Sequence, residues 1–314
     1  MTKTAFLFPG QGSQFVGMGN DLYSNYDIAK QVFDIADSVL GKSITKLCFE
    51  GPEEYLKQTI NTQPSIVTMS IAALEVLKSE LDITPNYTAG HSLGEYCAMY
   101  SAGIMTLEDT LKAIQKRAEL MSSVSKGSMA AVLNASDEQL KLGLEEGLKH
   151  GYVDIANYNS PVQVVITGDA AAVKAAGDYM LSNGVKRVIP LAVSGAFHSE
   201  YMKEAGSEFK DFIVNIELNN AKIPVITNVD AQITTKADDF REKMPKQIYS
   251  SVRWTQTIQR MISDGVDTFI EIGPGKVLAG LNRKIAPEAK VYNIYDMETL
   301  KNTVKLLNSQ MAGV

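Results

Sequence analysis

The stretch Gly90-His91-Ser92-Leu93-Gly94 constrains the fold of this chain more than any other part of its sequence. A short β-prone run, Tyr87-Thr88-Ala89, precedes it, and residues 93–104 follow it with a helical pattern. Strand, tight turn and helix in this order are the context in which a Gly-x-Ser-x-Gly motif forms a nucleophile elbow. Glycines flank the serine because the turn is strained and a neighbouring backbone must come close. The motif therefore predicts a turn that lifts the Ser92 hydroxyl clear of a sheet.

Such an elbow makes Ser92 a candidate nucleophile. The N–H of Leu93 then lies at a helix N-terminus, where it can donate a hydrogen bond to an oxyanion. A Gly-Ser turn without chemistry is the alternative for the bare motif, and the strand–turn–helix context favours the nucleophile.

Alternating strands and helices around the elbow indicate an α/β fold with a mostly parallel sheet covered on both faces. After Gly127 the order changes to β-α-β-β-α-β, which is the ferredoxin-like arrangement. We therefore expect a large domain formed by residues 1–126 and 197–314, with a small ferredoxin-like subdomain at residues 127–196 inserted into it. The expected helices are 28–39, 53–58, 65–81, 93–104, 106–124 (N-cap Thr106), 136–150 (N-cap Ser136), 170–182 and 199–214, with one more after Gly275, and the expected strands are 4–8, 87–89, 129–133, 153–157, 163–167, 187–193, 224–228 and 268–271.

The composition is that of an ordinary globular protein. Of the 314 residues, 45% are hydrophobic and 21% are charged, which excludes a mainly disordered chain. The net charge of −6 argues against a general nucleic-acid binder. Since neither a signal peptide nor an apolar membrane span is visible, we expect a cytoplasmic protein without membrane association. The two cysteines form no C-x-x-C pair and the three histidines form no ligand motif, so no metal is expected.

A serine nucleophile needs a base, and the three histidines are the candidates. In a tight turn the side chain of His91 should diverge from that of Ser92. His150 ends a helix of the small subdomain, where a solvated residue is the simplest interpretation. His198 remains, in the segment that returns to the large domain, where a cleft is expected. A structural hydrogen bond at a helix start is the alternative for His198. No well-placed Asp or Glu lies between Ser92 and His198, which is unlike an ordinary hydrolase.

Two further residues are candidates for binding. The loop Gly10-Gln11-Gly12 follows the first strand, and Gln11 is the natural second oxyanion donor, with a plain strand-end turn as the alternative. This loop lacks the third glycine of a dinucleotide fingerprint and the ending of a P-loop, so we expect no nucleotide cofactor. Arg117 suits a substrate carboxylate because its planar fork binds one bidentately, and a surface arginine is the alternative.

Together these motifs resemble the malonyl-CoA:acyl-carrier-protein transacylase family over nearly the whole chain. The resemblance implies an α/β-hydrolase-like core with a ferredoxin-like insertion. It depends on Phe8-Pro9-Gly10-Gln11-Gly12-Ser13-Gln14, Thr62-Gln63-Pro64, Gly90-His91-Ser92-Leu93-Gly94-Glu95-Tyr96, Arg117, Asn157-Tyr158-Asn159-Ser160-Pro161, Ala196-Phe197-His198-Ser199, Gln247 with Trp254, and Glu271-Ile272-Gly273-Pro274-Gly275.

The resemblance also implies roles for individual residues. Ser92 would be acylated with His198 as its base, and the backbone carbonyl of Gln247 would orient that histidine in place of an acid. The amides of Gln11 and Leu93 would form the oxyanion hole. The substrate-binding residues would be Arg117 for the malonyl carboxylate, Phe197 for selection against a branched acyl group, Gln63 and Asn159. The chain departs from the common pattern after Tyr249, where Ser250-Ser251 replaces the frequent Asn-Pro.

The implied reaction is ping-pong transfer of malonyl from malonyl-CoA to acyl carrier protein by a monomer that needs no cofactor. Acyl carrier protein is typically acidic, so Lys186-Arg187 and Arg283-Lys284 are candidate docking residues, with scattered solvated charges as the alternative. A serine hydrolase or thioesterase, a non-catalytic acyl-CoA-binding protein, and a transferase for another acyl group or for a polyketide carrier are the competing interpretations.

Overall fold

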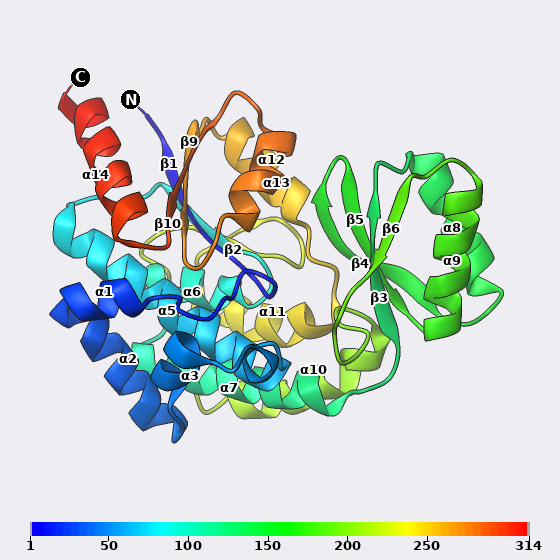
Figure 1. Cartoon of the computed structure of the whole chain (residues 1–314), viewed down its shortest axis with the longest axis horizontal. Helices are drawn as coiled ribbons and strands as arrows, with labels where there is room; N and C mark the ends of the chain where they lie inside the picture. Colours follow the sequence, from blue (N-terminus) through cyan, green and yellow to red (C-terminus); the bar gives the residue numbers. More distant parts are fainter. Residues whose placement is uncertain (1, 313–314) are drawn as a thin grey trace.

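Two β-sheets organise the computed structural model, which describes residues 2–312 (Figure 1). The larger sheet has the strand order β10-β9-β1-β2-β7-β8, in which all neighbours are parallel except β7 and β8. The smaller, antiparallel sheet has the order β4-β5-β3-β6. The expected mixed α/β fold with a mostly parallel sheet is confirmed. The strands are β1 (Thr4–Phe8), β2 (Tyr87–Gly90), β3 (Ser128–Leu133), β4 (Val153–Ser160), β5 (Gln163–Gly168), β6 (Arg187–Pro190), β7 (Val225–Ile226), β8 (Ile233–Thr234), β9 (Thr268–Ile272) and β10 (Lys290–Ile294).

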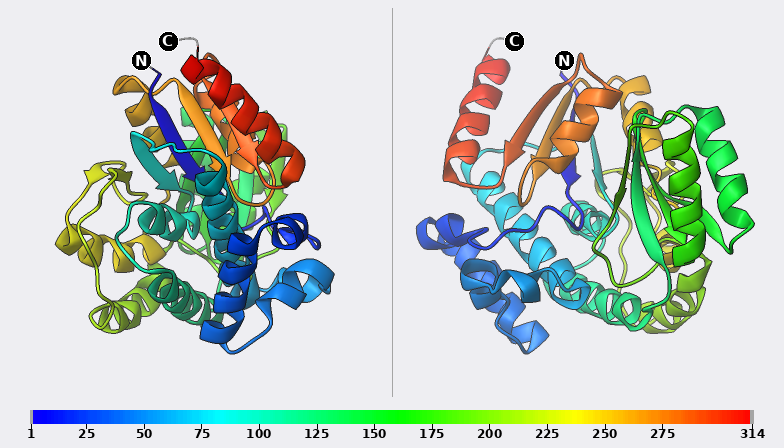
Figure 2. Two further views of the ribbon diagram at one scale, coloured as in Figure 1. Left: turned by 90° about the vertical axis from the view of Figure 1, so that its left-hand side faces the viewer. Right: turned by 45° about the vertical axis from the view of Figure 1, so that its right-hand side comes forward.

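Helices surround the larger sheet, and two more lie against the outer face of the smaller one (Figure 2). They are α1 (Asn20–Asn25), α2 (Asp27–Leu40), α3 (Ile44–Glu50), α4 (Glu53–Leu56), α5 (Thr59–Glu80), α6 (Gly94–Ser101), α7 (Leu107–Ser123), α8 (Asp137–Leu148), α9 (Ala170–Ser182), α10 (Lys203–Ile213), α11 (Ala237–Tyr249), α12 (Trp254–Ser263), α13 (Val277–Ile285) and α14 (Met297–Ala312), with a 3₁₀ turn, η1, at Glu200–Met202.

Strand β1 shows why the larger sheet is covered on both faces. All of its residues are buried. Phe6 and Phe8 belong to a hydrophobic cluster that includes residues of α2, α5 and α7, whereas Ala5 and Leu7 belong to a second cluster with residues of α12 and α13. Successive side chains of a strand point to opposite faces, so an unbroken apolar run requires helices on both sides.

The smaller sheet is also apolar on both faces. Ala130, Val132 and Ile166 pack against α8 and α9. Met129 and Val165, whose positions alternate with these, join the hydrophobic cluster of the larger part. The smaller sheet therefore packs against the rest of the molecule with one face and against its own helices with the other.

Several predicted element boundaries are confirmed. Thr106 caps α7 by accepting a hydrogen bond from the N–H of Asp109. Ser136 caps α8 and forms a capping box with Gln139, which satisfies two N–H groups that a helix start leaves free. Helix α9 has the predicted bounds.

The predicted start of α5 at Ser65 is wrong, because the helix begins at Thr59 and continues through Pro64. Proline lacks the N–H that would bond the carbonyl of Ile60. The Lys42 ammonium donates a hydrogen bond to that carbonyl at 3.2 Å, which compensates for the missing helical bond.

Other differences lie at the ends of elements and in elements that were not predicted. The strand predicted to run to residue 193 ends at Pro190, and the single helix predicted over 199–214 is divided into η1 and α10. The elements without a prediction are α1, α3, α11, α12, α14, β8 and β10.

Candidate active site

The turn between β2 and α6 has the geometry of a nucleophile elbow. Ser92 adopts a left-handed backbone with φ of 52°, which non-glycine residues rarely do. A Cβ atom on Gly90 would lie 1.9 Å from the carbonyl carbon of Gly94, and one on Gly94 would lie 2.2 Å from the carbonyl oxygen of Phe8. Both glycines are therefore required by close backbone approach at the point where strand, turn and helix meet.

The imidazole of His198 bonds the Ser92 hydroxyl, with Nε2 at 2.9 Å from Oγ. Its Nδ1 lies 3.0 Å from each of the carbonyl oxygens of Gln247 and Ser250. Carbonyl oxygens only accept, so Nδ1 carries the proton and Nε2 is free to accept one from Ser92. Two backbone carbonyls thus orient the histidine where an ordinary triad has a carboxylate.

The environment keeps His198 neutral. Burial lowers its pKa to about 3, and the positive charge of Arg117 and the neighbouring His91 act in the same direction. The hydrogen bonds to the carbonyls of Gln247 and Ser250 oppose this shift but do not overcome it. A neutral imidazole at neutral pH is the form that acts as a base.

Arg117 is fully buried, so the surface alternative is wrong. Its Nη2 donates to Ser92 Oγ and to Gln247 Oε1, both at 3.0 Å, and its Nη1 donates to Gln63 Oε1 at 2.7 Å. Within the part of the chain that the structure describes, its Nε has no acceptor. The site therefore places a cation with spare donor capacity directly beside the hydroxyl of Ser92.

The Gln247 side chain has a contact that the sequence did not suggest. Its Nε2 donates to the carbonyl oxygen of Ser92 at 2.7 Å. Because a peptide unit is planar and trans, holding this carbonyl also fixes the direction of the N–H of Leu93. Gln247 thereby contacts both members of the Ser92–His198 pair.

The loop with Gln11 lies against the elbow. A Cβ atom on Gly10 would come within 2.7 Å of the His91 carbonyl oxygen, and the N–H of His91 donates to the carbonyl of Phe8. The Gln11 side chain bonds Thr59 Oγ1 at 3.2 Å. Among the described residues, neither the N–H of Gln11 nor that of Leu93 has an acceptor.

The other candidate residues lie around this centre. Phe197 is buried in the main hydrophobic cluster, next to His198. Gln63 contacts Arg117 as described above. Asn159 lies on β4 of the smaller sheet, and its Oδ1 is 2.8 Å from Nε2 of His91. The side chain of His91 is therefore directed to the smaller sheet and away from Ser92, as the tight turn predicted.

Strand β4 of the smaller sheet also holds the segment that carries Ser250. The N–H of Val252 donates to the carbonyl of Ala156 at 2.8 Å, and Ser251 Oγ donates to the carbonyl of Ile155 at 2.6 Å. Position 251 is where the chain departs from the frequent Asn-Pro, and proline has no hydroxyl for this bond. The smaller sheet thus supports one of the carbonyls that orient His198.

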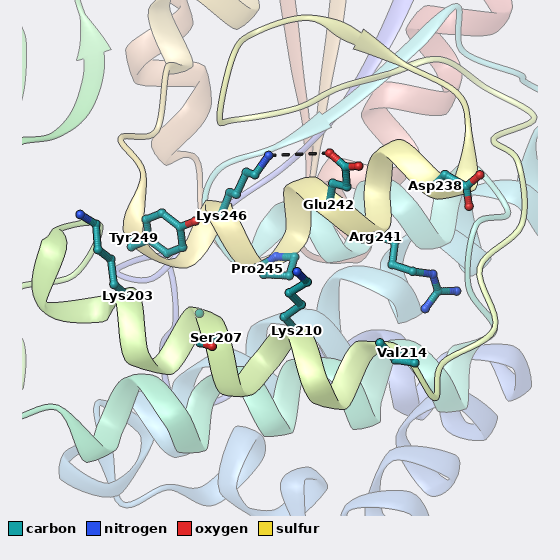
Figure 3. A pocket seen from close by; sticks show the side chains of 11 residues that line it. Lys203, Ser207, Lys210, Val214, Asp238, Arg241, Glu242, Pro245, Lys246 and Tyr249 are labelled. Atoms are coloured by element: carbon teal, nitrogen blue, oxygen red, sulfur yellow. Dashed lines mark ion pairs between the residues drawn. The ribbon is translucent and has the colours of Figure 1, made fainter.

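One groove on the surface is lined by residues other than those of this centre. A groove of about 800 Å³ lies between α10 and α11, and the side chain of Lys210 reaches from α10 toward Pro245 of α11 (Figure 3). Lys246 instead extends toward Glu242, with which it forms an ion pair. None of the residues that line it is a side-chain hydrogen-bond partner of Ser92, whose described partners of this kind are Asn228, His198, Arg117 and Gln247. Within residues 2–312 the structure has no cluster of His, Cys, Asp and Glu able to hold a metal, and no helix long and apolar enough to cross a membrane.

Comparison with known proteins identifies the family. Residues 5–303 match the family described as "Acyl transferase domain". The chain is 45% identical over 314 residues to the malonyl CoA-acyl carrier protein transacylase of Bacillus subtilis, covering 99% of both proteins. The chain belongs to the malonyl CoA-acyl carrier protein transacylase family. The resemblance stated from the motifs is confirmed.

Solved structures of this family share the fold. The transacylase of Clostridium perfringens has a TM-score of 0.94 and 36% identity, covering 99% of both chains. A malonyl-transacylase solved in complex with a type II polyketide acyl-carrier protein has a TM-score of 0.93 and 35% identity, covering 97% of this chain and 99% of that one.

Proposed function

We propose that this chain transfers the malonyl group of malonyl-CoA to the phosphopantetheine thiol of acyl carrier protein through a malonyl-Ser92 intermediate. One observation carries the proposal: Ser92 Oγ lies 2.9 Å from Nε2 of His198 and 3.0 Å from Nη2 of Arg117. A neutral base and a buried cation at one hydroxyl suit an acyl group that itself ends in a carboxylate.

In the first half of the reaction, His198 Nε2 takes the Ser92 proton as Oγ attacks the thioester carbonyl. The N–H groups of Gln11 and Leu93, which have no acceptor among residues 2–312, bind the oxyanion. The C–S bond then breaks, and the coenzyme A sulfur leaves with the proton from His198. In the second half, the carrier thiol gives its proton to His198 and attacks the malonyl ester, and Ser92 leaves and regains that proton.

Arg117 gives the reaction its acyl selectivity. Formation of the ester removes the hydroxyl of Ser92, and the guanidinium turns its donors to the malonyl carboxylate. Gln63 holds the guanidinium in place from the other side. The buried ring of Phe197 leaves little room for a branched acyl group. Asn159 forms part of the boundary of the site and holds the imidazole of His91 by a hydrogen bond.

The carrier protein docks through basic residues at the surface. Lys186, Arg187, Arg283 and Lys284 are all exposed, in keeping with this role. The solved relative in complex with an acyl-carrier protein supports a macromolecular acyl acceptor. Exchange of these residues for glutamate should slow transfer to the carrier without slowing acylation of Ser92, and added salt should have the same effect.

The proposal includes an α/β-hydrolase-like domain at residues 1–126 and 197–314, and a ferredoxin-like subdomain at residues 127–196. The antiparallel order β4-β5-β3-β6, with α8 and α9 on one face, supports the ferredoxin-like assignment. The proposed enzyme is a cytoplasmic monomer, and it needs no cofactor because malonyl-CoA is itself an activated substrate.

Intact-protein mass spectrometry after mixing with malonyl-CoA tests the proposed function. One malonyl adduct is expected on the wild type and none on Ser92→Ala. Arg117→Ala should accumulate far less malonyl adduct and gain relative preference for acetyl-CoA. Release of free malonate without any adduct would identify a hydrolase, and unchanged malonyl-CoA with no adduct would identify a binding protein.

A further inference from the structure

We propose that Asn228 is the positioning residue of the nucleophile elbow: with Glu95, it fixes the backbone of Ser92 and thereby the direction of the Leu93 N–H. This inference rests on the proposed function in treating Ser92 as the nucleophile. Asn228 lies just beyond β7, the strand that pairs with β2 in the larger sheet. Among the described residues, the hydrogen bonds of Asn228 go to Gly90, Ser92, Glu95 and the N–H of Arg253, and none goes to His198.

The carboxamide of Asn228 forms hydrogen bonds with two backbone groups of the turn, one before and one after His91. Oδ1 accepts from the N–H of Ser92 at 2.8 Å, and Nδ2 donates to the carbonyl of Gly90 at 2.7 Å. Asn228 is buried, so water does not replace either bond without a rearrangement. A side chain with one acceptor and one donor at this spacing is what the two peptide groups require.

Glu95 completes the arrangement from the first turn of α6. Its Oε2 accepts from the backbone N–H of Asn228 at 2.6 Å, and the carboxyl group is buried. Burial raises the pKa of Glu95 to about 7, while the Asn228 N–H and Arg117 pull it down. A carboxyl oxygen accepts a hydrogen bond in either protonation state, so the contact persists across neutral pH.

Asn228 and Gln247 hold the two peptide planes on either side of the Ser92 Cα. Asn228 bonds the N–H of Ser92, and Gln247 bonds its C=O. Because each plane is rigid, fixing both determines the φ and ψ angles of Ser92, which include the left-handed φ of 52°. Those two angles set where Oγ meets His198 and where the Leu93 N–H points.

Substitutions at Asn228 separate this role from simple packing. Asn228→Ala leaves the Ser92 N–H and the Gly90 carbonyl without partners. Asn228→Asp keeps the size and the acceptor but places a carboxylate oxygen against the Gly90 carbonyl. Asn293→Ala is the matched control. Asn293 lies on β10, the edge strand at the end of the larger sheet far from β7, and it donates a hydrogen bond to the buried Glu271.

The test measures two reactions at Ser92 in the full-length protein. Single-turnover labelling by an uncharged fluorophosphonate, in which an Oγ–P bond forms as fluoride leaves, requires the oxyanion donors but no malonyl recognition. Malonylation by malonyl-CoA requires both. Each rate is taken per folded molecule, and the melting temperature is recorded for each variant.

For Asn228→Ala we expect both rate constants to fall by roughly 100-fold, the size of losing one well-placed oxyanion donor. The malonyl-CoA concentration giving half-maximal rate should stay unchanged, because Arg117 is not displaced. Asn228→Asp should be slowed at least about tenfold, since a misdirected donor loses part of the same stabilisation. Asn293→Ala should lose stability without losing rate.

Rates within about threefold of wild type in Asn228→Asp, or in a folded Asn228→Ala, would overturn the inference. If Asn228 served packing alone, its substitution would lower the melting temperature and leave the rate per folded molecule unchanged. A wild type that is labelled by fluorophosphonate but never malonylated would instead contradict the proposed function, and slower labelling of the Asn228 variants would still uphold the inference.

Discussion

Removing the charge of Arg117 should make His198 easier to protonate and shift the acid limit of Ser92 reactivity toward neutral pH. Burial is the main reason that the pKa of His198 lies at about 3, and Arg117 is the next. An imidazolium next to a guanidinium is disfavoured, so the arginine helps to keep the base neutral. The variant Arg117→Ala removes that repulsion and leaves the burial largely unchanged.

The geometry sets the size of the effect. Ser92 Oγ lies 3.0 Å from Nη2 of Arg117 and 2.9 Å from Nε2 of His198, so these two nitrogens are at most about 6 Å apart. Unit charges at that separation repel by about 3 kcal/mol at an effective dielectric constant of about 20. An energy of that size corresponds to about two pH units in the protonation of His198. The acid limit should therefore move from about pH 3 to about pH 5.

Fluorophosphonate labelling of Ser92 is the suitable assay, because Arg117 is proposed to bind malonyl-CoA and its loss would also change the reaction with that substrate. The labelling rate is followed from about pH 4 to pH 8, with circular dichroism at each pH to verify folding. The wild type should be flat over this range, and Arg117→Ala should fall to half its plateau near about pH 5. Arg117→Lys keeps the charge and should resemble the wild type, as should Arg260→Ala, whose guanidinium pairs with Asp264 away from the site.

The position of the acid limit decides the question, whatever the plateau rate of each variant. A wild-type inflection near pH 6.5, the ordinary value for histidine, would show that His198 is not held neutral by its surroundings. Coincident limits in wild type and Arg117→Ala would show that the arginine charge does not reach the base.

Three further predictions concern the framework of the site. Gly94→Ala places a Cβ 2.2 Å from the carbonyl oxygen of Phe8, so chemical denaturation should show a loss of about 3 kcal/mol or more, with loss of fluorophosphonate labelling. Burial raises the pKa of Glu271 to about 7. The stabilisation of the folded state by the protonated carboxyl is therefore fully present below its ordinary pKa of 4.5 and is lost as pH rises through about 7. The free energy of unfolding should fall by about 3 kcal/mol over this pH range in the wild type, and this fall should be absent in Glu271→Gln. Ser251→Ala removes the bond to the Ile155 carbonyl and should cost about 1 kcal/mol of stability by denaturant titration, while acylation stays near wild type because the Gln247 carbonyl still orients His198. An unfolding free energy equal to that of the wild type in Gly94→Ala or in Ser251→Ala would contradict these assignments. A wild-type dependence of the unfolding free energy on pH in Glu271→Gln would do the same.

The elbow was accessible from sequence because its determinants are local. Ser92 and its flanking glycines stand within five residues, and each glycine is required by a close backbone approach that the motif itself predicts. The pairing with His198 was reached by elimination among three histidines, and the 2.9 Å contact agrees with it. Local rules of this kind also gave the helix caps at Thr106 and Ser136.

Contacts between distant segments were not accessible in this way. Asn228 lies 136 positions after Ser92 and follows a strand of two residues, so nothing near it in the sequence indicates that its carboxamide reaches the elbow. The carbonyl of Gln247 was suggested by family resemblance alone. Its helix, α11, was not predicted because Pro245 interrupts the helical sequence pattern. For the same reason the start of α5 was predicted after Pro64, although the helix begins at Thr59.

Transfer from the isolated acyl-enzyme tests the central claim most directly. The malonylated protein, freed of malonyl-CoA, is mixed with acyl carrier protein that bears its phosphopantetheine thiol, and the products are measured by mass spectrometry. The proposed function predicts that malonyl appears on the carrier thiol much faster than free malonate appears in water, and that Ser92 returns to its unmodified mass. Release of malonate at the same rate with and without the carrier would show that the Ser92 ester is an intermediate of hydrolysis, and would contradict the assignment as a transferase.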